Sequence, residues 1–297
     1  MTFYEIEFPL ATLSSEAVEA ALFEVGASSI TFVDRGNEPV LEPKPGEMRL
    51  WSDTLVRALF QESSDAALNL DRLASTLGPH VTQTARVRAV QDQVWERAWL
   101  AGWKSLRFGR RLWVCPRAAE VPGDRHAVVV RLDPGLAFGT GTHPTTALCL
   151  QILDSMALAG QTVIDYGCGS GILGIAALKL GAAQVIAVDL DPQALLATRD
   201  NALRNGVASS MTVQNIDVRL PGANCVMANI LAGPLIELAP KLTAACRPGG
   251  YLLLSGLLKT QAYSVRAAYA SGFDMVQVIE RDEWCCIYAR RLSEEPV

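Results

Sequence analysis

Two carboxylates stand at the ends of apolar runs and flank a glycine-rich turn. Asp165 lies two residues before the turn Gly-Cys-Gly-Ser-Gly at residues 167–171, and Asp189 closes the next apolar run. Glycine lets a ligand approach the backbone where a side chain would hold it away. A carboxylate at the end of the second strand can bind both ribose hydroxyls. The pattern predicts a pocket for a nucleotide-type cofactor, with Asp165 accepting a hydrogen bond from its ammonium group, directly or through water, and Asp189 holding its ribose.

The spacing of the glycines separates two kinds of cofactor. Residues 167–171 read G-x-G-x-G, whereas dinucleotide-binding folds use G-x-G-x-x-G to place backbone amides against a pyrophosphate. S-adenosylmethionine has no phosphate, so its turn needs room only for the amino-acid end and the sulfonium. The motif therefore favours S-adenosylmethionine and disfavours a nicotinamide oxidoreductase.

A second stretch, residues 132–146, is rich in glycine and threonine and leads into a predicted helix. A phosphate-binding P-loop needs lysine after its last glycine, but here Thr142 follows Gly141. We expect a glycine-hinged lid whose threonines at the helix start reach the cofactor, with Phe138 against the cofactor or the target group. His143 is either a catalytic base or a residue that caps the helix and fixes the loop.

A third motif, Met-Ala-Asn-Ile-Leu-Ala-Gly-Pro at residues 227–234, follows an apolar strand, where open α/β sheets place their ligands. Amino-methyltransferases commonly carry Asn or Asp, two prolines and an aromatic residue here. This chain keeps Asn229 but has Ile, Leu and Ala after it. Asn229 can accept a hydrogen bond from an amine and aim the nitrogen lone pair at the methyl carbon, so it is the candidate catalytic residue. Without the aromatic ring, stacking on a flat base is disfavoured and a bulkier, already methylated amine has space.

These side chains need a sheet to position them. From about residue 160 apolar strands alternate with helices, which predicts a parallel α/β sheet with helices on both faces. The last two strands, predicted over 275–281 and 284–290, are joined by a tight turn, so one must run antiparallel. This ending is typical of the Rossmann-like class I S-adenosylmethionine-dependent methyltransferase domain, a mostly parallel sheet with an antiparallel C-terminal hairpin. Before it, residues 108–115 and 126–132 are predicted to form another hairpin.

The first 95 residues follow a different order, β-α-β-β-α-β, which predicts a small ferredoxin-like α+β domain. Within it, residues 53–60 are predicted as a short helix and residues 82–90 as the last strand. The domain contains no catalytic cluster, so its expected role is recognition of the substrate.

A linker helix is predicted after this domain. Trp95, Trp99 and Trp103 recur every four residues and form one stripe on such a helix. The stripe is either an apolar seam packed between domains or a peptide-binding surface. The predicted organisation is a substrate-recognition domain over 1–95, a linker helix over 96–106 and a methyltransferase catalytic domain over 107–297.

Composition and charge restrict the class of protein. Half of the 297 residues are apolar, which predicts a packed globular protein. The net charge of −5 predicts no overall positive electrostatic field that would attract nucleic acid. Seven cysteines without a C-x-x-C pair, and only three histidines, favour buried reduced thiols and disfavour a zinc site. The absence of a signal peptide and of a membrane-length apolar run predicts a cytoplasmic protein. The basic cluster Arg107, Arg110, Arg111 and Arg117 is either a solvated face or a contact to an RNA-bearing partner.

Together the motifs resemble the bacterial PrmA-type ribosomal protein methyltransferases, which modify protein eleven of the large ribosomal subunit. The segments that carry the resemblance are residues 132–146, 163–171, 188–192 and 229–235. The resemblance implies methylation of lysine ε-amino and N-terminal α-amino groups of that protein, free or during ribosome assembly, with S-adenosylmethionine as cofactor. From the residues themselves we expect no metal and no membrane contact, and of the oligomeric states left open we expect a monomer. The family's cofactor positions fall here on Thr146, Gly167, Asp189 and Asn229.

Two alternatives stay open. The chain could be an RNA or other nucleic-acid methyltransferase, which its acidic balance and the residues after Asn229 disfavour. It could also be a non-catalytic scaffold that binds S-adenosylmethionine, which the presence of Asn229 and the lid disfavours. Which amines are methylated, and to what degree, does not follow from the residues.

Overall fold

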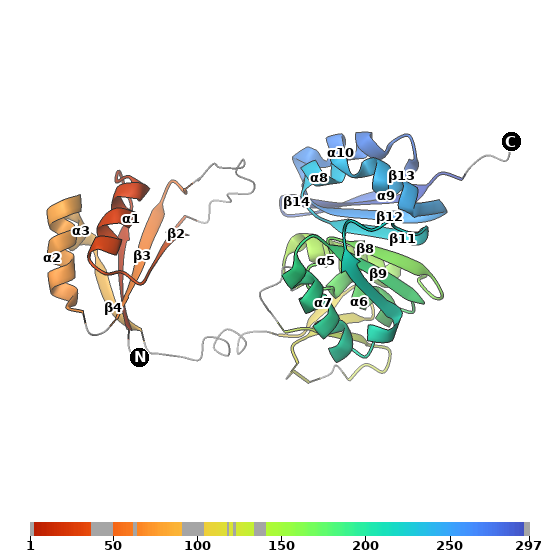
Figure 1. Ribbon diagram of the computed structural model, residues 1–297, viewed down its shortest axis with the longest axis horizontal. Coiled ribbons are helices and arrows are strands. Elements are labelled where there is room, and N and C mark those ends of the chain that lie inside the picture. Colours follow the sequence, from red (N-terminus) through yellow and green to blue (C-terminus); the bar gives the residue numbers. More distant parts are fainter. Residues whose placement is uncertain are drawn as a thin grey trace. The chain divides into compact units, whose positions relative to one another are not determined.

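The computed structural model describes residues 3–36, 50–61, 64–90, 104–117, 119–120, 123–133 and 141–293. The chain divides into two compact units, Met1–Ala98 and Trp99–Val297, coloured red to orange and yellow to blue in Figure 1. The tryptophan stripe and most of the predicted linker helix lie outside the described residues. Leu106, placed at the end of that helix by the sequence, already belongs to a strand.

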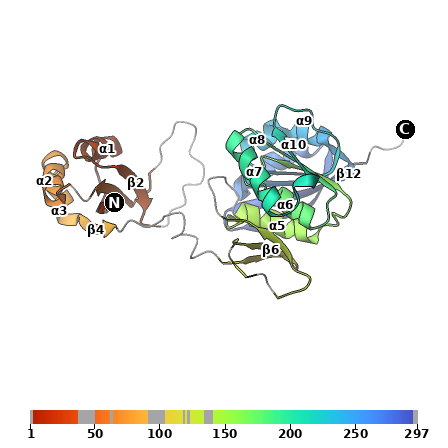
Figure 2. The same cartoon turned by 60° about the horizontal axis from the view of Figure 1, so that its bottom comes forward.

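The first unit is a four-stranded antiparallel sheet in the order β2-β3-β1-β4, the arrangement of a ferredoxin-like domain. Its elements are β1 (Phe3–Pro9), α1 (Ser15–Glu24), β2 (Ser29–Asp34), β3 (Thr54–Gln61), α2 (Ala66–Leu77), α3 (His80–Thr84) and β4 (Arg86–Val90). Alternate residues of β1 and β3 are buried in an apolar core to which α1 and α2 contribute. Figure 2 shows these two helices beside the strands of this unit. The predicted ferredoxin-like fold is confirmed.

Two local predictions in this unit were wrong. Residues 53–60, predicted as a helix, form most of β3, because Leu55, Ala58 and Leu59 fit a helical face but the neighbouring strands on both sides select the two-residue period. The strand predicted from residue 82 begins only at Arg86, since the short helix α3 occupies the preceding residues.

The second unit contains a seven-stranded sheet in the order β10-β9-β8-β11-β12-β14-β13. Only β14 runs in the direction opposite to the other strands of this sheet, so the predicted parallel sheet with an antiparallel C-terminal hairpin is confirmed. The strands are β8 (Thr162–Tyr166), β9 (Gln184–Asp189), β10 (Met211–Asn215), β11 (Ala223–Asn229), β12 (Cys246–Leu258), β13 (Phe273–Arg281) and β14 (Trp284–Arg291).

Helices cover both faces of this sheet, as predicted, and each face has its own apolar core (Figure 1). One face carries α5 (Pro144–Ser155), α6 (Ile172–Lys179) and α7 (Pro192–Arg204); the other carries α8 (Ala232–Glu237), α9 (Ala239–Ala245) and α10 (Ala262–Tyr269). The single helix predicted over 234–245 is divided at Leu238, and Pro240 falls in the first turn of α9. All seven cysteines are buried and unpaired, as expected.

A small three-stranded sheet extends the first of these cores. It consists of β5 (Leu106–Phe108), β6 (Leu112–Cys115) and β7 (Val128–Arg131). The hairpin predicted between 108–115 and 126–132 was wrong: β5 and β6 form the hairpin, whereas β6 and β7 are parallel. The connection between β6 and β7 is long enough for the crossover that parallel strands require. Among the described residues, no helix has the length and apolar character needed to span a membrane.

Candidate active site

The glycine-rich turn after β8 is held from two neighbouring elements. The backbone N–H groups of Gly167 and Cys168 both donate to the carbonyl of Val188 in β9, at 2.8 and 3.1 Å. From α7, Thr198 Oγ1 donates to the Gly169 carbonyl at 3.0 Å and Asn201 Nδ2 donates to the Ser170 carbonyl at 2.9 Å. The turn is therefore fixed before any ligand binds.

Gly167 is required at its position for two reasons. Its φ of +75° lies in the left-handed region, and a Cβ atom there would collide with Ile230 Cγ2. Ile230 directly follows Asn229, so the glycine lets the turn after β8 approach the end of β11. The two motifs found separately in the sequence thus meet at one edge of the sheet.

We expect Gly167→Ala to lower the free energy of unfolding by about 2 kcal/mol or more, since it adds a collision to backbone strain. Gly160→Ala is the matched control, because Gly160 has a similar φ of +72° but nothing within 4 Å of a Cβ atom. Only the strain of about 1 kcal/mol should apply there. Urea unfolding of both variants measures the difference, and equal losses would contradict the collision.

Asp189 lies at the carboxyl end of β9 and braces the turn. Its Oδ2 accepts from the Gly169 N–H at 2.8 Å, and its Oδ1 accepts from the Asp191 N–H at 3.0 Å. An ionised carboxylate offers about four lone-pair sites, so this half-buried group keeps acceptor capacity for two further donors. That capacity matches a pair of hydroxyl groups.

Asp165 has a different position from the one the sequence suggested. Its side chain is 1% exposed, and Oδ2 accepts from the Gly174 N–H in α6 at 2.8 Å. Burial, with a smaller contribution from the charge of Asp189, raises the pKa of Asp165 to about 7. The carboxyl group is therefore buried and bound to α6, which does not fit direct acceptance from a ligand's ammonium.

This burial predicts a pH dependence of stability. The pKa of Asp165 is about 7 in the folded protein and about 3.9 in an unfolded chain. Between about pH 4 and about pH 7 Asp165 is therefore protonated in the folded protein and ionised in the unfolded chain. The free energy of unfolding consequently falls as pH rises from about 4 to about 7. Relative to Asp165→Asn, the wild type should lose on the order of 4 kcal/mol across that window. Urea unfolding at several pH values checks this, and a stability difference independent of pH would contradict it.

Asn229 ends β11 and meets Thr146 from the first turn of α5. Asn229 Nδ2 donates to Thr146 Oγ1 at 3.3 Å, and Thr146 is fully buried. Asn229 Oδ1 is buried and has no hydrogen-bond partner among the described residues. A buried amide oxygen without a partner is costly unless a ligand supplies the donor. The geometry therefore provides one acceptor for an incoming N–H group.

His143 caps α5 through its side chain. Its Nδ1 lies 2.7 Å from Thr145 Oγ1 and accepts weakly from the Thr145 N–H at 3.4 Å. The ring packs edge-on against Trp284, with centroids 4.8 Å apart, and burial lowers the pKa of His143. Of the two roles open in the sequence, the structure supports the cap and loop-fixing role. Phe138 lies outside the described residues.

The sequence did not identify Ser255 or Trp284 as parts of this region. Ser255 lies beside Asn229 in the register of β11 and β12, and its buried hydroxyl lies 3.1 Å from the Cys285 carbonyl and 3.3 Å from the Thr145 carbonyl. It thereby ties the start of α5 to the sheet. In the sequence, Ser255 could have been noticed only as the single hydroxyl residue that follows the apolar run 252–254. No comparable signal marked Trp284, which comes from the hairpin at the end of the chain.

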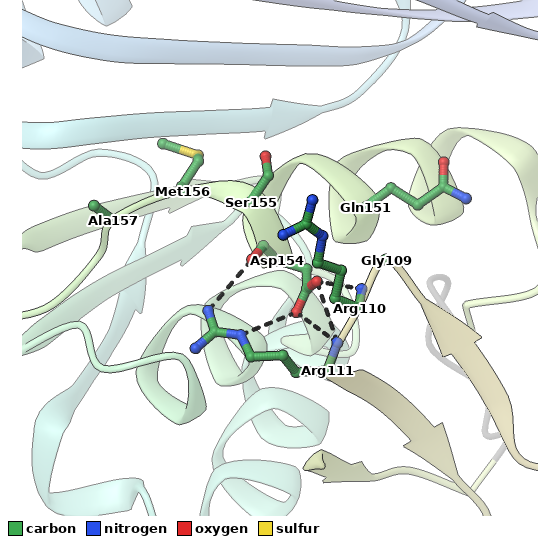
Figure 3. Close-up of a pocket in the computed structure, with 8 residues that line it drawn as sticks. All are labelled: Gly109, Arg110, Arg111, Gln151, Asp154, Ser155, Met156 and Ala157. Carbon is green, nitrogen blue, oxygen red and sulfur yellow. Dashed lines mark hydrogen bonds and ion pairs between the residues drawn. The ribbon is translucent and has the colours of Figure 1, made fainter. Parts of the chain in front are cut away.

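A pocket at the opposite end of α5 belongs to the packing of the fold (Figure 3). It measures about 630 Å³, and its lining includes Arg110, Arg111 and Asp154. The Asp154 carboxylate accepts from the backbone N–H groups of Arg110 and Leu112 and pairs with the Arg111 guanidinium at 3.5 Å. This acid is thus occupied in fixing the β5–β6 turn.

Comparison with known proteins decides the family. The family described as Ribosomal protein L11 methyltransferase (PrmA) matches residues 2–292. The chain belongs to this family. Curated members named ribosomal protein L11 methyltransferase from Sodalis glossinidius and Vibrio cholerae are 51% and 50% identical over 296 residues, covering 98% and 99% of this chain and all of each relative.

A solved structure supports the same assignment. The ribosomal protein L11 methylase from Lactobacillus delbrueckii subsp. bulgaricus is 31% identical, with a TM-score of 0.59, and the match covers 64% of this chain and all of that one. The resemblance read from the sequence is therefore confirmed at the level of family and fold. The roles of individual site residues remain predictions.

Proposed function

We propose that this chain is an S-adenosylmethionine-dependent protein N-methyltransferase that methylates lysine ε-amino and N-terminal α-amino groups of ribosomal protein L11. Membership of the family and the names of its members support the substrate. The single observation that carries the chemistry is the buried, unpartnered Oδ1 of Asn229 at the carboxyl edge of the sheet. An acceptor in that position suits an amine, and it has no hydrogen-bond partner in the described part of the chain.

The residues fit the cofactor. Gly167 lets the turn approach the end of β11 beside Asn229, Asp189 keeps acceptor capacity for ribose hydroxyls, and Thr146 lies against Asn229 at the same end of the sheet. Gly167, Asp189, Thr146 and Asn229 would hold S-adenosylmethionine. When bound, it supplies an electrophilic methyl group on a positively charged sulfonium.

The chain's own residues orient the amine. Thr146 Oγ1 accepts from Asn229 Nδ2, which turns the amide so that Oδ1 is left to accept an N–H from the target nitrogen. That hydrogen bond fixes the direction of the nitrogen lone pair. Holding two reactants in line can contribute roughly 7–11 kcal/mol to lowering the barrier. Thr146 thus acts as a positioning residue and Asn229 as the catalytic one.

The amine must be neutral to react. Deprotonating a free lysine at pH 7 costs about 4–5 kcal/mol, and apolar surroundings lower that cost by disfavouring the ammonium form. His143 is engaged as a helix cap, so it is not assigned as the base. Solvent takes the proton in this proposal.

We expect Asp189→Ala to weaken S-adenosylmethionine binding by at least about tenfold. The change removes the ribose acceptor and also the brace on Gly169, which corresponds to a loss of about 1.4 kcal/mol or more. Calorimetry measures the affinity, with Asp191→Ala as the control from the same loop, since Asp191 only caps α7. Equal affinity in Asp189→Ala and wild type would remove the ribose role.

The proposed function is tested by incubating the protein with methyl-labelled S-adenosylmethionine, with a ribosomal-protein mixture in one arm and purified ribosomal RNA in the other. Label in the protein arm, in the band of protein L11, is expected. Label only in RNA would establish a nucleic-acid methyltransferase, and cofactor binding without transfer to either substrate would establish a scaffold.

We further propose that residues 1–95 recognise the substrate protein and that residues 107–297 carry the reaction. All of the site residues named above lie in Trp99–Val297, and the first unit has a separate core. The enzyme is proposed to act as a cytoplasmic monomer without a metal ion.

A further inference from the structure

Arg117, one residue of the basic cluster recognised in the sequence, lines a pocket with two further arginines, Arg131 and Arg204. The protein carries a net charge of −5, yet residues 104–133 contain seven Lys and Arg against three Asp and Glu. Arg107 donates to the Arg110 carbonyl and lies over the ring of Trp113, while Arg111 pairs with Asp154. Arg117 is not part of these contacts and lies in a separate pocket.

That pocket collects three guanidinium groups around one carboxylate. It has a volume of about 230 Å³ and is lined by Arg117, Arg131, Asp133 and Arg204. Within the described part of the chain, none of the three arginines forms an ion pair. Their charges are therefore not neutralised by the residues that the structure describes.

Two sets of hydrogen bonds fix the frame of this arginine pocket. Arg131 Nη1 donates to the carbonyls of Pro116 and Ala119, at 2.7 and 2.6 Å. The backbone of Arg131 is paired with the side chain of Asn205, which accepts its N–H at 2.7 Å and donates to its carbonyl at 2.8 Å. Since Asn205 directly follows Arg204, these bonds hold the end of β7 against the end of α7.

The carboxylate in the pocket also serves the frame. Asp133 Oδ1 accepts from the backbone N–H of Arg117 at 2.7 Å, which links the segment after β6 to the segment after β7. Among the described lining residues, three positive charges against one negative charge leave an excess of two. Arg131 donates its two side-chain hydrogen bonds to neutral carbonyls, so its charge is not neutralised and three of its five N–H donors are left.

We propose that the arginine pocket binds a phosphate group. Planar guanidinium forks match the oxygens of phosphate and bind them with paired hydrogen bonds. The side chain of Arg117 makes no hydrogen bond among the described residues, and Arg204 makes one, from Nη1 to Asn201 Oδ1 at 3.3 Å. The pocket uses none of the proposed active-site residues, so this inference stands apart from methyl transfer. The phosphate can come from inorganic phosphate or from an RNA backbone.

Two titrations of the full chain distinguish these sources. Calorimetry with inorganic phosphate tests the free anion, and fluorescence anisotropy with a labelled single-stranded RNA of about 12 nucleotides tests the backbone phosphate. The double variant Arg117→Gln, Arg204→Gln should weaken binding at least about tenfold. For RNA it should also reduce the slope of log affinity against log salt by about 1.

Arg199→Gln is the matched control, because Arg199 is exposed on the same helix α7 and does not line the pocket. Its binding should stay within about twofold of wild type, and thermal unfolding verifies that the variants fold. If the double variant is unstable, Arg117 alone is replaced, because its side chain makes no hydrogen bond among the described residues. Loss of RNA binding in the variant identifies a backbone phosphate, and loss of inorganic phosphate binding alone identifies a free anion. Absence of binding by both ligands, or equal binding in variant and wild type, overturns the proposal.

Discussion

Replacing Asn229 with alanine is expected to lower kcat for methyl transfer by about 100-fold or more, with cofactor affinity retained at least in part. The change removes the unpartnered Oδ1 that would hold the target amine in line. Losing a single preorganised hydrogen-bonding group in an active site typically costs about 10²–10³ in kcat. Steady-state kinetics with protein L11 and calorimetry with S-adenosylmethionine measure the two effects separately.

A second asparagine on the same strand provides the control. Asn224 lies near the start of β11, at the opposite end of this strand from Asn229, and its Oδ1 accepts from the Thr162 N–H at 3.1 Å. Asn224→Ala also removes a side-chain amide from β11 but should leave kcat unchanged. Thr146→Val should give a smaller decrease in kcat than Asn229→Ala, because it only frees the amide to rotate. Unaltered kinetics in Asn229→Ala would exclude Asn229 from the mechanism.

Removing residues 1–98 is expected to abolish methylation of protein L11 while cofactor binding survives. The proposed cofactor residues lie entirely in the unit Trp99–Val297, which has its own apolar cores. If the first unit binds the substrate, kcat/KM should fall by at least about 100-fold, which corresponds to about 2.7 kcal/mol of lost binding.

The truncated protein needs two measurements. Calorimetry with S-adenosylmethionine shows whether the remaining unit is folded and competent to bind, and the transfer assay shows whether it recognises protein L11. Undiminished methylation by the truncated chain would contradict a recognition role for the first unit. Loss of both properties would show instead that the two units depend on each other for folding.

The second unit was predictable from sequence because its strands are buried on both faces. Such strands appear as continuous apolar runs, and the runs that end at Asp189 and Asn229 have the same ends in the structure. The tight turn between the last two strands likewise required an antiparallel pair. Strands covered on one face were less clear: Leu55, Ala58 and Leu59 fit a helix until their neighbours in β1 and β2 are known.

The candidate site was predictable where a residue type follows directly from a strand end. Gly167 and Asn229 could be selected in that way, and the structure brings their segments together through Ile230. The burial of Asp165 depends on α6 packing over it, which no local pattern reports. Ser255 and Trp284 join the region through pairing with strands distant in sequence, so residue spacing alone could not identify them.

The most direct test is peptide-mapping mass spectrometry of purified ribosomal protein L11 after incubation with this protein and S-adenosylmethionine. The proposed function predicts methyl groups on lysine ε-amino and N-terminal α-amino nitrogens in the presence of the wild type, and few or none with Asn229→Ala. Protein L11 that stays unmodified with the folded, cofactor-bound wild type would contradict it.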